Sequence, residues 1–157
     1  MTPRIFLSDH GGDFEAFCSA CYQCYMDFWD NCPQFGGKDI LRALALENGR
    51  EKVFWGIVEG HDNQKQFENL ERYEKIPCLA FLIQAVALND ADVKWFRIRH
   101  KGKLRVQIFS KAHRYLMVLQ ERKKVFDFVT AHPISQRQLD KKMEQYEASL
   151  KAENGVL

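Results

Sequence analysis

The chain has 157 residues, of which 28% are charged and 46% hydrophobic, a composition that fits a folded globular domain and excludes an intrinsically disordered chain. The formal net charge is only +2, and no run of 18 apolar residues occurs, so we expect neither a uniformly basic protein nor a membrane-spanning helix. The N-terminus lacks the long apolar stretch of a secretory signal, and the five cysteines are an odd number. These features predict one domain over residues 1–157, in the cytoplasm, with reduced thiols and no membrane contact.

The first predicted element is a helix over residues 13–31, in which aromatic residues and cysteines recur at helical spacing and Asp13 is the expected N-cap. Thiolates at short spacing can hold zinc or an iron–sulfur cluster, and the candidate ligands are Cys18, Cys21, Cys24 and Cys32. Zinc knuckles place their cysteine pairs on turns, whereas no glycine separates the first three cysteines here. We therefore favour cysteines that pack as small hydrophobic side chains, with no metal and no cofactor, and keep a metal-binding protein as an alternative.

The next predicted elements complete a mainly helical region over residues 13–92. Residues 38–47 are expected to form a short helix that ends at Asn48-Gly49. Residues 50–61 are apolar and aromatic, and their pattern fits either a strand or a helix. Residues 62–75 are polar and lead into a helix over residues 76–88, which starts with Pro77 in its first turn. Because this last segment is strongly apolar, we expect it to lie across a sheet.

Residues 93–130 read as four short strands separated by turn-like clusters, which predicts an antiparallel meander. Alternating apolar and polar residues predict one dry face, covered by a helix, and one wet face. Ser135 is the expected N-cap of a C-terminal helix over residues 135–151. The predicted fold class is therefore α+β, with N-terminal helices packed on a four-stranded antiparallel meander and one helix after it.

Positive charge is concentrated in the predicted sheet. Between Val93 and Lys124 there are 11 Lys or Arg residues and one acidic residue, so this segment carries +10 and the rest of the chain −8. A cationic wet face on an acidic body favours a polyanionic partner, most simply RNA or another nucleic acid. The candidate nucleic-acid-binding residues are Arg97, Arg99, Lys101, Lys103, Arg105, Lys111, Arg114, Arg122 and Lys123. The alternative is that these side chains only keep the sheet edges unpaired.

A series of short motifs follows the whole chain. It comprises Phe35-Gly36-Gly37-Lys38, Gly49–Trp55, Leu70–Pro77, Lys94-Trp95, Tyr115–Leu119, Arg122, Thr130-Ala131 and Glu144–Glu147. Over residues 14–147 this series resembles the phage-borne nuclease-like domains of the barnase–EndoU–colicin–RelE superfamily of small RNases. The resemblance implies that superfamily's α+β fold and a toxin-like, phage- or prophage-associated endoribonuclease. It also implies cleavage of RNA by 2′-hydroxyl transesterification without a metal, and a cognate inhibitor protein as a partner.

Metal-independent RNA cleavage needs a base for the 2′-hydroxyl, cations and donors for the phosphate, and an acid for the leaving oxygen. The candidate catalytic residues are Arg72, Lys75, Thr130, His132 and His61. The resemblance aligns Arg72 and Lys75 with an arginine-rich stretch of the family, and an arginine fork matches phosphate geometry. The alternative for Arg72 is a surface ion pair with Glu74. Thr130 and His132 lie on one side of the last strand if that strand continues.

The chain departs from the family pattern at two positions. Gly56 follows Phe54-Trp55 where we expect a histidine, and His132 follows Thr130-Ala131 where a tyrosine is usual. If the expected histidine is the general base of the family, then His61 or His132 replaces it, or the site is inactive. An inactive site would leave a nucleic-acid-binding module of the same fold.

Overall fold

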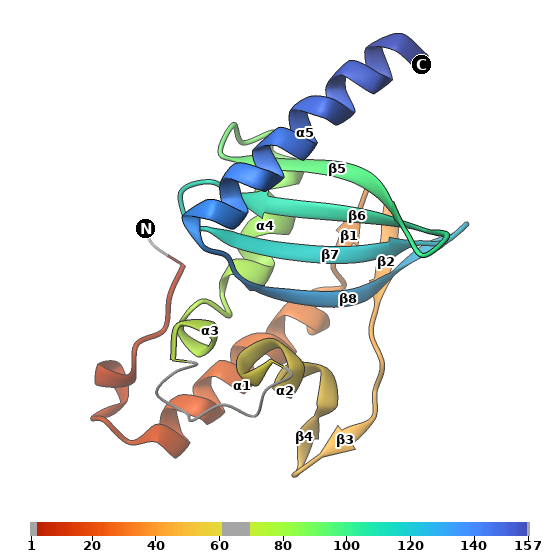
Figure 1. Ribbon diagram of the computed structural model, residues 1–157. Coiled ribbons are helices and arrows are strands. Elements are labelled where there is room, and N and C mark those ends of the chain that lie inside the picture. The colour runs from red at the N-terminus through yellow and green to blue at the C-terminus, as the bar shows by residue number, and fades with distance from the viewer. Residues whose placement is uncertain (1–2, 61–69, 157) are drawn as a thin grey trace.

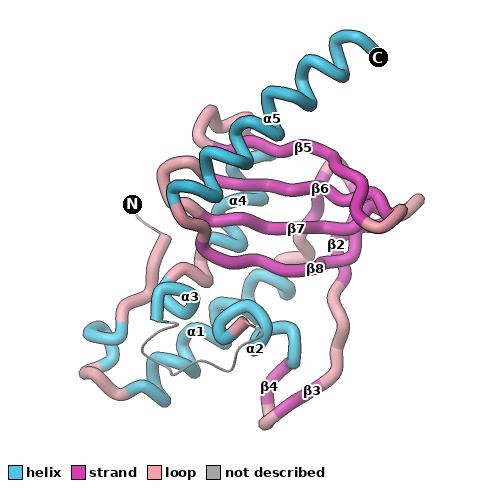
Figure 2. Tube along the Cα trace, in the orientation of Figure 1, coloured by secondary structure: helices cyan, strands magenta, loops and turns pink. Residues whose placement is uncertain are grey.

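The computed structural model describes residues 3–60 and 70–156, and it is an α+β arrangement of one main sheet with helices on both faces (Figure 1). Its helical segments are η1 (Leu7–His10), α1 (Phe14–Asp30), α2 (Lys52–Glu59), α3 (Leu70–Glu74), α4 (Cys78–Ala87) and α5 (Gln136–Val156). Its strands are β1 (Gln34–Phe35), β2 (Lys38–Leu41), β3 (Leu46–Glu47), β4 (Arg50–Glu51), β5 (Val93–His100), β6 (Lys103–Ser110), β7 (Tyr115–Glu121) and β8 (Val125–Pro133). In Figure 2, the helices before β5 lie together on one side of the main sheet and α5 crosses the other.

The main sheet has six strands in the order β1-β2-β8-β7-β6-β5, and β3 and β4 form a separate hairpin. Strands β5 to β8 each pair antiparallel with the next along the chain, whereas β2 runs parallel to β8, with Ile40 opposite Phe126. The sheet is therefore mixed and larger than the four-stranded antiparallel sheet that the sequence predicts. The difference arises in residues 34–41, whose strands the sequence analysis did not identify.

The predicted helix over residues 38–47 is wrong. Gly36 and Gly37 have φ angles of 58° and 79° and form the tight turn between β1 and β2. Strand β2 then buries Ile40, which is 4% exposed, in the core beside β8. Leu44 and Leu46 are 68% and 70% exposed, so their spacing does not mark the buried face of a helix. Pairing with a strand far along the chain overrides the local pattern.

The face of the sheet that contacts α1, α2 and α4, here called the inner face, lies against the larger core. Val106, Ile108 and Met117 of the sheet pack there with a buried stripe of α4 that includes Leu79 and Leu82. The prediction that residues 76–88 form a helix across the sheet is confirmed. The predicted N-cap of α1 is also confirmed, because Ala16 N donates to Asp13 Oδ1 at 3.2 Å.

The opposite face, here called the outer face, packs against α5. Phe96, Phe109, Leu116, Val118 and Leu139 are buried together there in a second, smaller core. Residues 115–119 of β7 are all buried, which is the pattern of a strand covered on both sides. The prediction of one fully wet face is therefore wrong, because the helix after the sheet covers part of it.

Helix α5 begins at Ser135, as the sequence predicts. Gln138 N donates to Ser135 Oγ at 3.2 Å, and Ser135 N donates to Gln138 Oε1 at 2.8 Å. These reciprocal bonds form a capping box, which sets the direction in which α5 leaves the sheet. Within the described part of the chain, no helix has both the length and the apolarity needed to cross a bilayer.

Candidate nucleic-acid interface and active site

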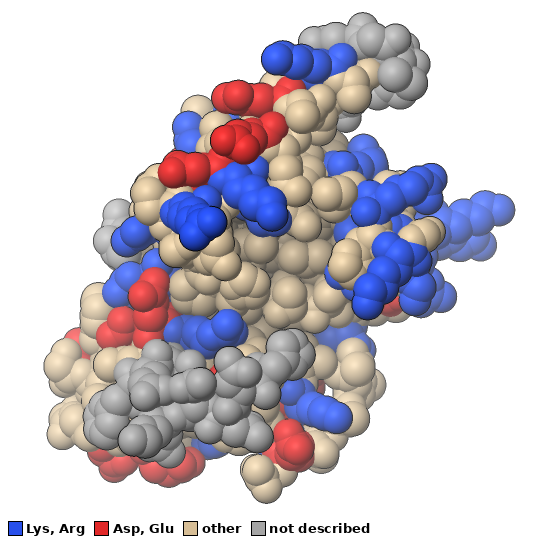
Figure 3. Space-filling view, in the orientation of Figure 1, with Lys and Arg blue, Asp and Glu red and all other residues tan. Residues whose placement is uncertain are grey.

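Most of the basic residues of the sheet gather at one end of it rather than over one face. The β5–β6 and β7–β8 turns lie at this end, and together they form a projecting group of Lys and Arg side chains (Figure 3). We call this group the basic rim; it comprises Arg97, Arg99, Lys101, Lys103, Arg122, Lys123 and Lys124. All seven side chains are exposed. The expected continuous cationic face is thus replaced by a cationic edge.

The remaining predicted nucleic-acid-binding residues are distributed elsewhere. Lys111 and Arg114 are exposed in the β6–β7 turn, at the opposite end of the sheet. Arg105 is half-buried and pairs in register with Ile98 and Gln120, on the outer face. The Arg105 Nε atom is buried and has no hydrogen-bond partner among the described residues. Arg105 therefore offers a desolvated donor between the basic rim and α5.

Part of the charge of the basic rim is neutralised by local ion pairs. Arg97 Nε lies 2.8 Å from Glu121 Oε1, and Lys38 Nζ lies 3.7 Å from Glu121 Oε2. The hydrogen bond from Arg97 is the main reason that the pKa of Glu121 is lowered. Arg122 pairs with Asp127 at 3.2 Å. Four lysines and Arg99 have no ion-pair partner within the described residues, so the rim keeps an excess of positive charge.

His132 and Thr130 lie near the far end of β8, on the outer face. Thr130 is opposite Val118 and His132 is opposite Leu116, so the two side chains share a face with residues of the second core. His132 Nδ1 lies 2.8 Å from Pro133 O, and a carbonyl can only accept, so Nδ1 carries the proton. The Nε2 atom of the neutral ring is then the one with a free lone pair. This tautomer is the one that a general base requires.

Burial and neighbouring cations keep His132 neutral. Burial is the main cause of its lowered pKa, and the positive charges of Arg72 and Lys142 lower it further, although the bond to Pro133 O acts in the opposite direction. A histidine with a lowered pKa is unprotonated at neutral pH. Arg72 on α3 and Lys142 on α5 both act on this ring electrostatically, and Lys142 also lines the space beside it.

The His132 side chain lines a cavity of about 270 Å³ at the start of α5, here called the His132 cavity. Its lining residues are Leu116, His132, Ile134, Gln138, Lys141 and Lys142. Burial, and then the charge of Lys141, lower the pKa of Lys142, whose Nζ donates to Gln145 Oε1 at 3.2 Å. A half-buried ammonium group with a lowered pKa is a better proton donor than an exposed lysine.

Sequence analysis did not identify Lys141 and Lys142 as site residues. Their position on α5 follows from the packing of Leu139 and Met143 on the outer face, which turns the intervening residues toward His132. The only sequence signal is the pair of adjacent lysines nearly two helical turns after the Ser135 cap. Because the sequence does not show which face of the sheet α5 covers, these lysines look like part of a solvent-exposed helix face.

The other predicted catalytic residues do not all join this group. Arg72 Nη1 donates to Ile57 O at 3.1 Å, so one arm of its guanidinium is committed to α2. Lys75 is 3% exposed, and its Nζ donates to His113 O at 2.6 Å and pairs with Glu71 at 3.0 Å. The buried ammonium of Lys75 thus joins α3 to the β6–β7 turn and is not open to a substrate. His61 lies outside the described residues.

The cysteines are divided between the core and the surface. Cys18 and Cys21 are buried in α1, Cys24 is half-buried and Cys32 is exposed. Burial raises the pKa of Cys21 to about 12 and that of Cys24 to about 11, so both thiols stay protonated at neutral pH. Within residues 3–60 and 70–156, no group of three or more His, Cys, Asp or Glu side chains is arranged to hold a metal ion. The predicted packing of Cys18 and Cys21 in the core is confirmed.

Comparison with known proteins gives no relative for this chain. No protein-family model matches it, and neither the curated proteins nor the solved structures include a significant match. The functional assignment therefore depends on the site itself.

Proposed function

We propose that the protein is an endoribonuclease that binds single-stranded RNA across the outer face and cleaves it by internal transesterification, without a metal ion. The observation that carries this proposal is the half-buried His132, with its Nε2 lone pair free, in a cavity that Lys141 and Lys142 also line. The antiparallel strands β5 to β8 with helices packed on them are also the arrangement expected of the barnase–EndoU–colicin–RelE superfamily, to which we propose the fold belongs.

Each required role has a candidate: His132 and Lys142 line the His132 cavity, whereas Thr130 and Arg72 lie outside its lining. His132 Nε2 takes the proton from the ribose 2′-hydroxyl, and the 2′-oxygen attacks the adjacent phosphorus. Arg72 and Lys142 stabilise the extra negative charge of the pentavalent phosphate, and the Thr130 hydroxyl donates to one of its oxygens. Lys142, with its lowered pKa, protonates the departing 5′-oxygen. The products are a 2′,3′-cyclic phosphate and a free 5′-hydroxyl.

The distance between the basic rim and His132 sets a minimum length for the RNA substrate. His132 lies eight residues beyond Lys124 along β8, and a strand rises about 3.3 Å per residue, so the two are separated by roughly 25 Å. An RNA that contacts both must extend over several nucleotides. We expect substitutions that neutralise cations of the basic rim to weaken RNA binding. We expect a substitution of His132 to slow the chemical step of cleavage.

Cleavage of a fluorescently labelled RNA oligonucleotide in EDTA tests the proposal. We expect products with cyclic phosphate ends, and we expect His132→Asn to lower the single-turnover rate by about 10²–10⁴-fold, the usual contribution of a general base. His10→Asn is the matched control, because His10 lies in η1 beside Phe17, away from the His132 cavity. The double variant Lys101→Gln/Lys123→Gln should weaken RNA binding and its salt dependence with little change in that rate. RNA that stays intact with a large excess of the unaltered protein would refute cleavage.

A nucleic-acid-binding module without activity is the second candidate, and Gly56 is the observation that favours it. Gly56 lies within α2, and a Cβ atom placed there meets no other atom within 4 Å. The Cβ atom of a histidine therefore meets no clash at the position where the resembled family is expected to have one. Cleavage that is absent in the unaltered protein but gained in Gly56→His would identify a disabled enzyme, whereas salt-dependent RNA binding with no cleavage in either form would identify a binding module.

A further inference from the structure

Strand β5 is a free edge of the main sheet, on the side away from β8. The strand order ends at β5, and no strand of the described chain pairs with its outer side. β5 has eight residues, whereas proteins commonly keep exposed edge strands short or cover them. A long uncovered edge is a site where an extended peptide can add as a further strand.

The ladder with β6 identifies the backbone groups that face outward. Lys111 N donates to Asp92 O at 3.1 Å, which extends the β5–β6 ladder by one pair beyond the pair of Val93 with Ser110. Hydrogen-bonded and non-hydrogen-bonded pairs alternate along an antiparallel ladder, so residues 93, 95, 97 and 99 direct their N–H and C=O groups away from β6. The Val93 N–H agrees with this direction, because it donates to Asp90 O at 3.2 Å and not to β6.

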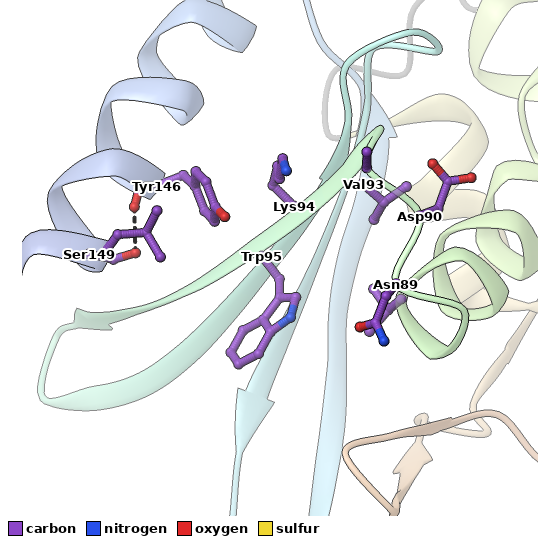
Figure 4. A pocket seen from close by; sticks show the side chains of 10 residues that line it. Asn89, Asp90, Val93, Lys94, Trp95, Tyr146 and Ser149 are labelled. Atoms are coloured by element: carbon purple, nitrogen blue, oxygen red, sulfur yellow. Dashed lines mark hydrogen bonds between the residues drawn. The ribbon is translucent and has the colours of Figure 1, made fainter. Parts of the chain in front are cut away.

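A hollow of about 400 Å³ adjoins this edge, between β5, the loop after α4 and the C-terminal part of α5 (Figure 4). Its walls come from β5, from α5 and from α4 with the loop after it, and the lining residues are Val86, Asn89, Asp90, Ala91, Val93, Lys94, Trp95, Tyr146, Ser149 and Leu150. Leu150 is 40% exposed, so the C-terminal part of α5 presents an apolar side chain to the hollow. The walls are mixed, and their apolar part, which includes Val93, Trp95 and Leu150, can receive one apolar side chain of a strand added to β5.

The charge beside this edge selects the chemistry of the added strand. Lys94, Arg97 and Arg99 are on β5 itself, and the β5–β6 turn adds Lys101 and Lys103. Among the described residues Arg97 pairs with Glu121, whereas the other four have no ion-pair partner. Edge-to-edge pairing of β5 with the same strand of a second copy would bring these cations together, which disfavours a homodimer through this edge. An acidic segment avoids this repulsion between cations, and the one carboxylate that lines the hollow is that of Asp90, beside Val93.

We propose that β5 binds an extended, acidic segment of a partner protein, which adds as a strand to the free edge and places one apolar side chain in the hollow between β5 and α5. This interaction uses the edge of the sheet and not the His132 cavity, so its test does not depend on RNA cleavage, although Arg97 and Arg99 also belong to the basic rim and RNA would compete for them. The partner supplies carboxylates opposite Arg97 and Arg99 and backbone groups opposite residues 95 and 97.

A synthetic peptide of about eight residues, the length of β5, tests the proposal. In this peptide Glu alternates with Val, and the central Val is replaced by Leu; the control peptide has Lys in place of Glu. Amide hydrogen exchange followed by NMR is the readout. We expect the Glu peptide to slow exchange at the outward-facing amides of Trp95, Arg97 and Arg99, and we expect the Lys peptide to have no effect.

Three variants separate strand addition from simple charge attraction. Arg97→Pro removes the guanidinium and an outward N–H without removing a donor to β6, whereas Arg97→Ala removes the guanidinium alone. The alanine variant should only weaken peptide binding, and the proline variant should abolish it while the far-ultraviolet spectrum is kept. Arg99→Glu changes an exposed side chain, so it should weaken Glu-peptide binding about tenfold and allow the Lys peptide to bind. The Arg99→Glu variant tests the proposal even if the proline disturbs the fold.

Three results would overturn the proposal. Unchanged exchange at these amides in millimolar Glu peptide would show that the edge does not accept an acidic strand. Protection that rises with protein concentration and without peptide, accompanied by a dimer in sedimentation, would assign the edge to a second copy. Protection by an RNA oligonucleotide, with none by either peptide, would assign it to nucleic acid.

Discussion

The substitution Glu51→Gln should destabilise the fold, because the Glu51 carboxylate holds three donors at once. Its Oε1 accepts from Tyr25 Oη at 2.7 Å and from Arg42 Nε at 2.8 Å, and its Oε2 accepts from Arg42 Nη2 at 2.8 Å. Glu51 is 5% exposed, whereas the Arg42 side chain keeps 19% of its exposure. The guanidinium also lies 4.9 Å from the ring of Trp29. These contacts tie the β3–β4 hairpin to α1.

The size of the expected loss of stability follows from the contacts that glutamine cannot make. It presents an amide donor to a guanidinium that can only donate, and it leaves the cation of Arg42 without its counter-charge. Breaking a buried ion pair from one side costs about 3–5 kcal/mol, and we place this substitution near 3 kcal/mol because Arg42 is partly solvated. Urea unfolding measures the difference, and Glu47→Gln, at an exposed position, is the control expected to change stability by less than about 0.5 kcal/mol.

The contacts of Glu51 with Arg42 and Tyr25 also predict that the stability of the fold depends on pH. Burial acts to raise the pKa of Glu51, but the hydrogen bonds from Arg42 and Tyr25 and the charge of Arg42 outweigh it, and the pKa is lowered. The unfolded chain therefore binds a proton before the folded protein does, so this stabilisation is present above the unfolded pKa and is lost as the pH falls through the folded one. The difference in the free energy of unfolding between Glu51→Gln and the unaltered protein should therefore become smaller at acidic pH. A difference in the free energy of unfolding below about 0.5 kcal/mol at neutral pH, or one that does not become smaller at acidic pH, would refute the reasoning.

Three further predictions concern the core, the α5 cap and His132. Leu82→Ala removes a fully buried side chain of α4 and should cost about 3 kcal/mol in urea unfolding, whereas Leu88→Ala, at a residue 81% exposed, should be neutral; equal effects would contradict the packing of α4 on the inner face. Ser135→Ala removes the acceptor for Gln138 N and should cost about 1 kcal/mol, with Ser135→Asn restoring most of it; no loss would mean that the capping box does not stabilise α5. Burial and the charges of Arg72 and Lys142 lower the pKa of His132, so its protonation favours the unfolded chain and stability should fall as the pH drops from 7 below the unfolded value near 6.5. His132→Gln should remove that component, and an unchanged slope between pH 7 and 5 would show that His132 is not desolvated.

Local signals in the sequence predict the elements that depend on neighbouring residues. Asp13 and Ser135 cap the helices that they were expected to cap, and the apolar stripe of residues 76–88 forms α4. The elements that depend on distant partners were missed. Strand β2 exists because Ile40 lies beside Phe126 of β8, and no spacing within residues 38–47 indicates that pairing.

The candidate site was predictable only in part for the same reason. Thr130 and His132 share a face because side chains alternate along any strand, so their proximity follows from the sequence. Lys141 and Lys142 reach His132 only because α5 covers the outer face. The apolar residues on both faces of β7 indicate that both faces of the sheet are covered. The alternating pattern of β5 and β6 indicates instead that one face is exposed, and the prediction followed that pattern. The sequence does not show whether Lys75 is exposed, so a catalytic and a structural role look alike there. In the structure Lys75 is buried and bonded to His113 O, which gives it a structural role.

The position of α5 in the chain has a consequence for when the protein can act during its synthesis. The His132 cavity takes residues from β7, β8 and α5, and α5 is translated after all the other strands and helices. A growing chain that still holds α5 inside the ribosome has His132 but not Lys141 and Lys142, and its outer face is bare. If His132 cleaves RNA, its cavity is therefore incomplete until α5 has left the ribosome.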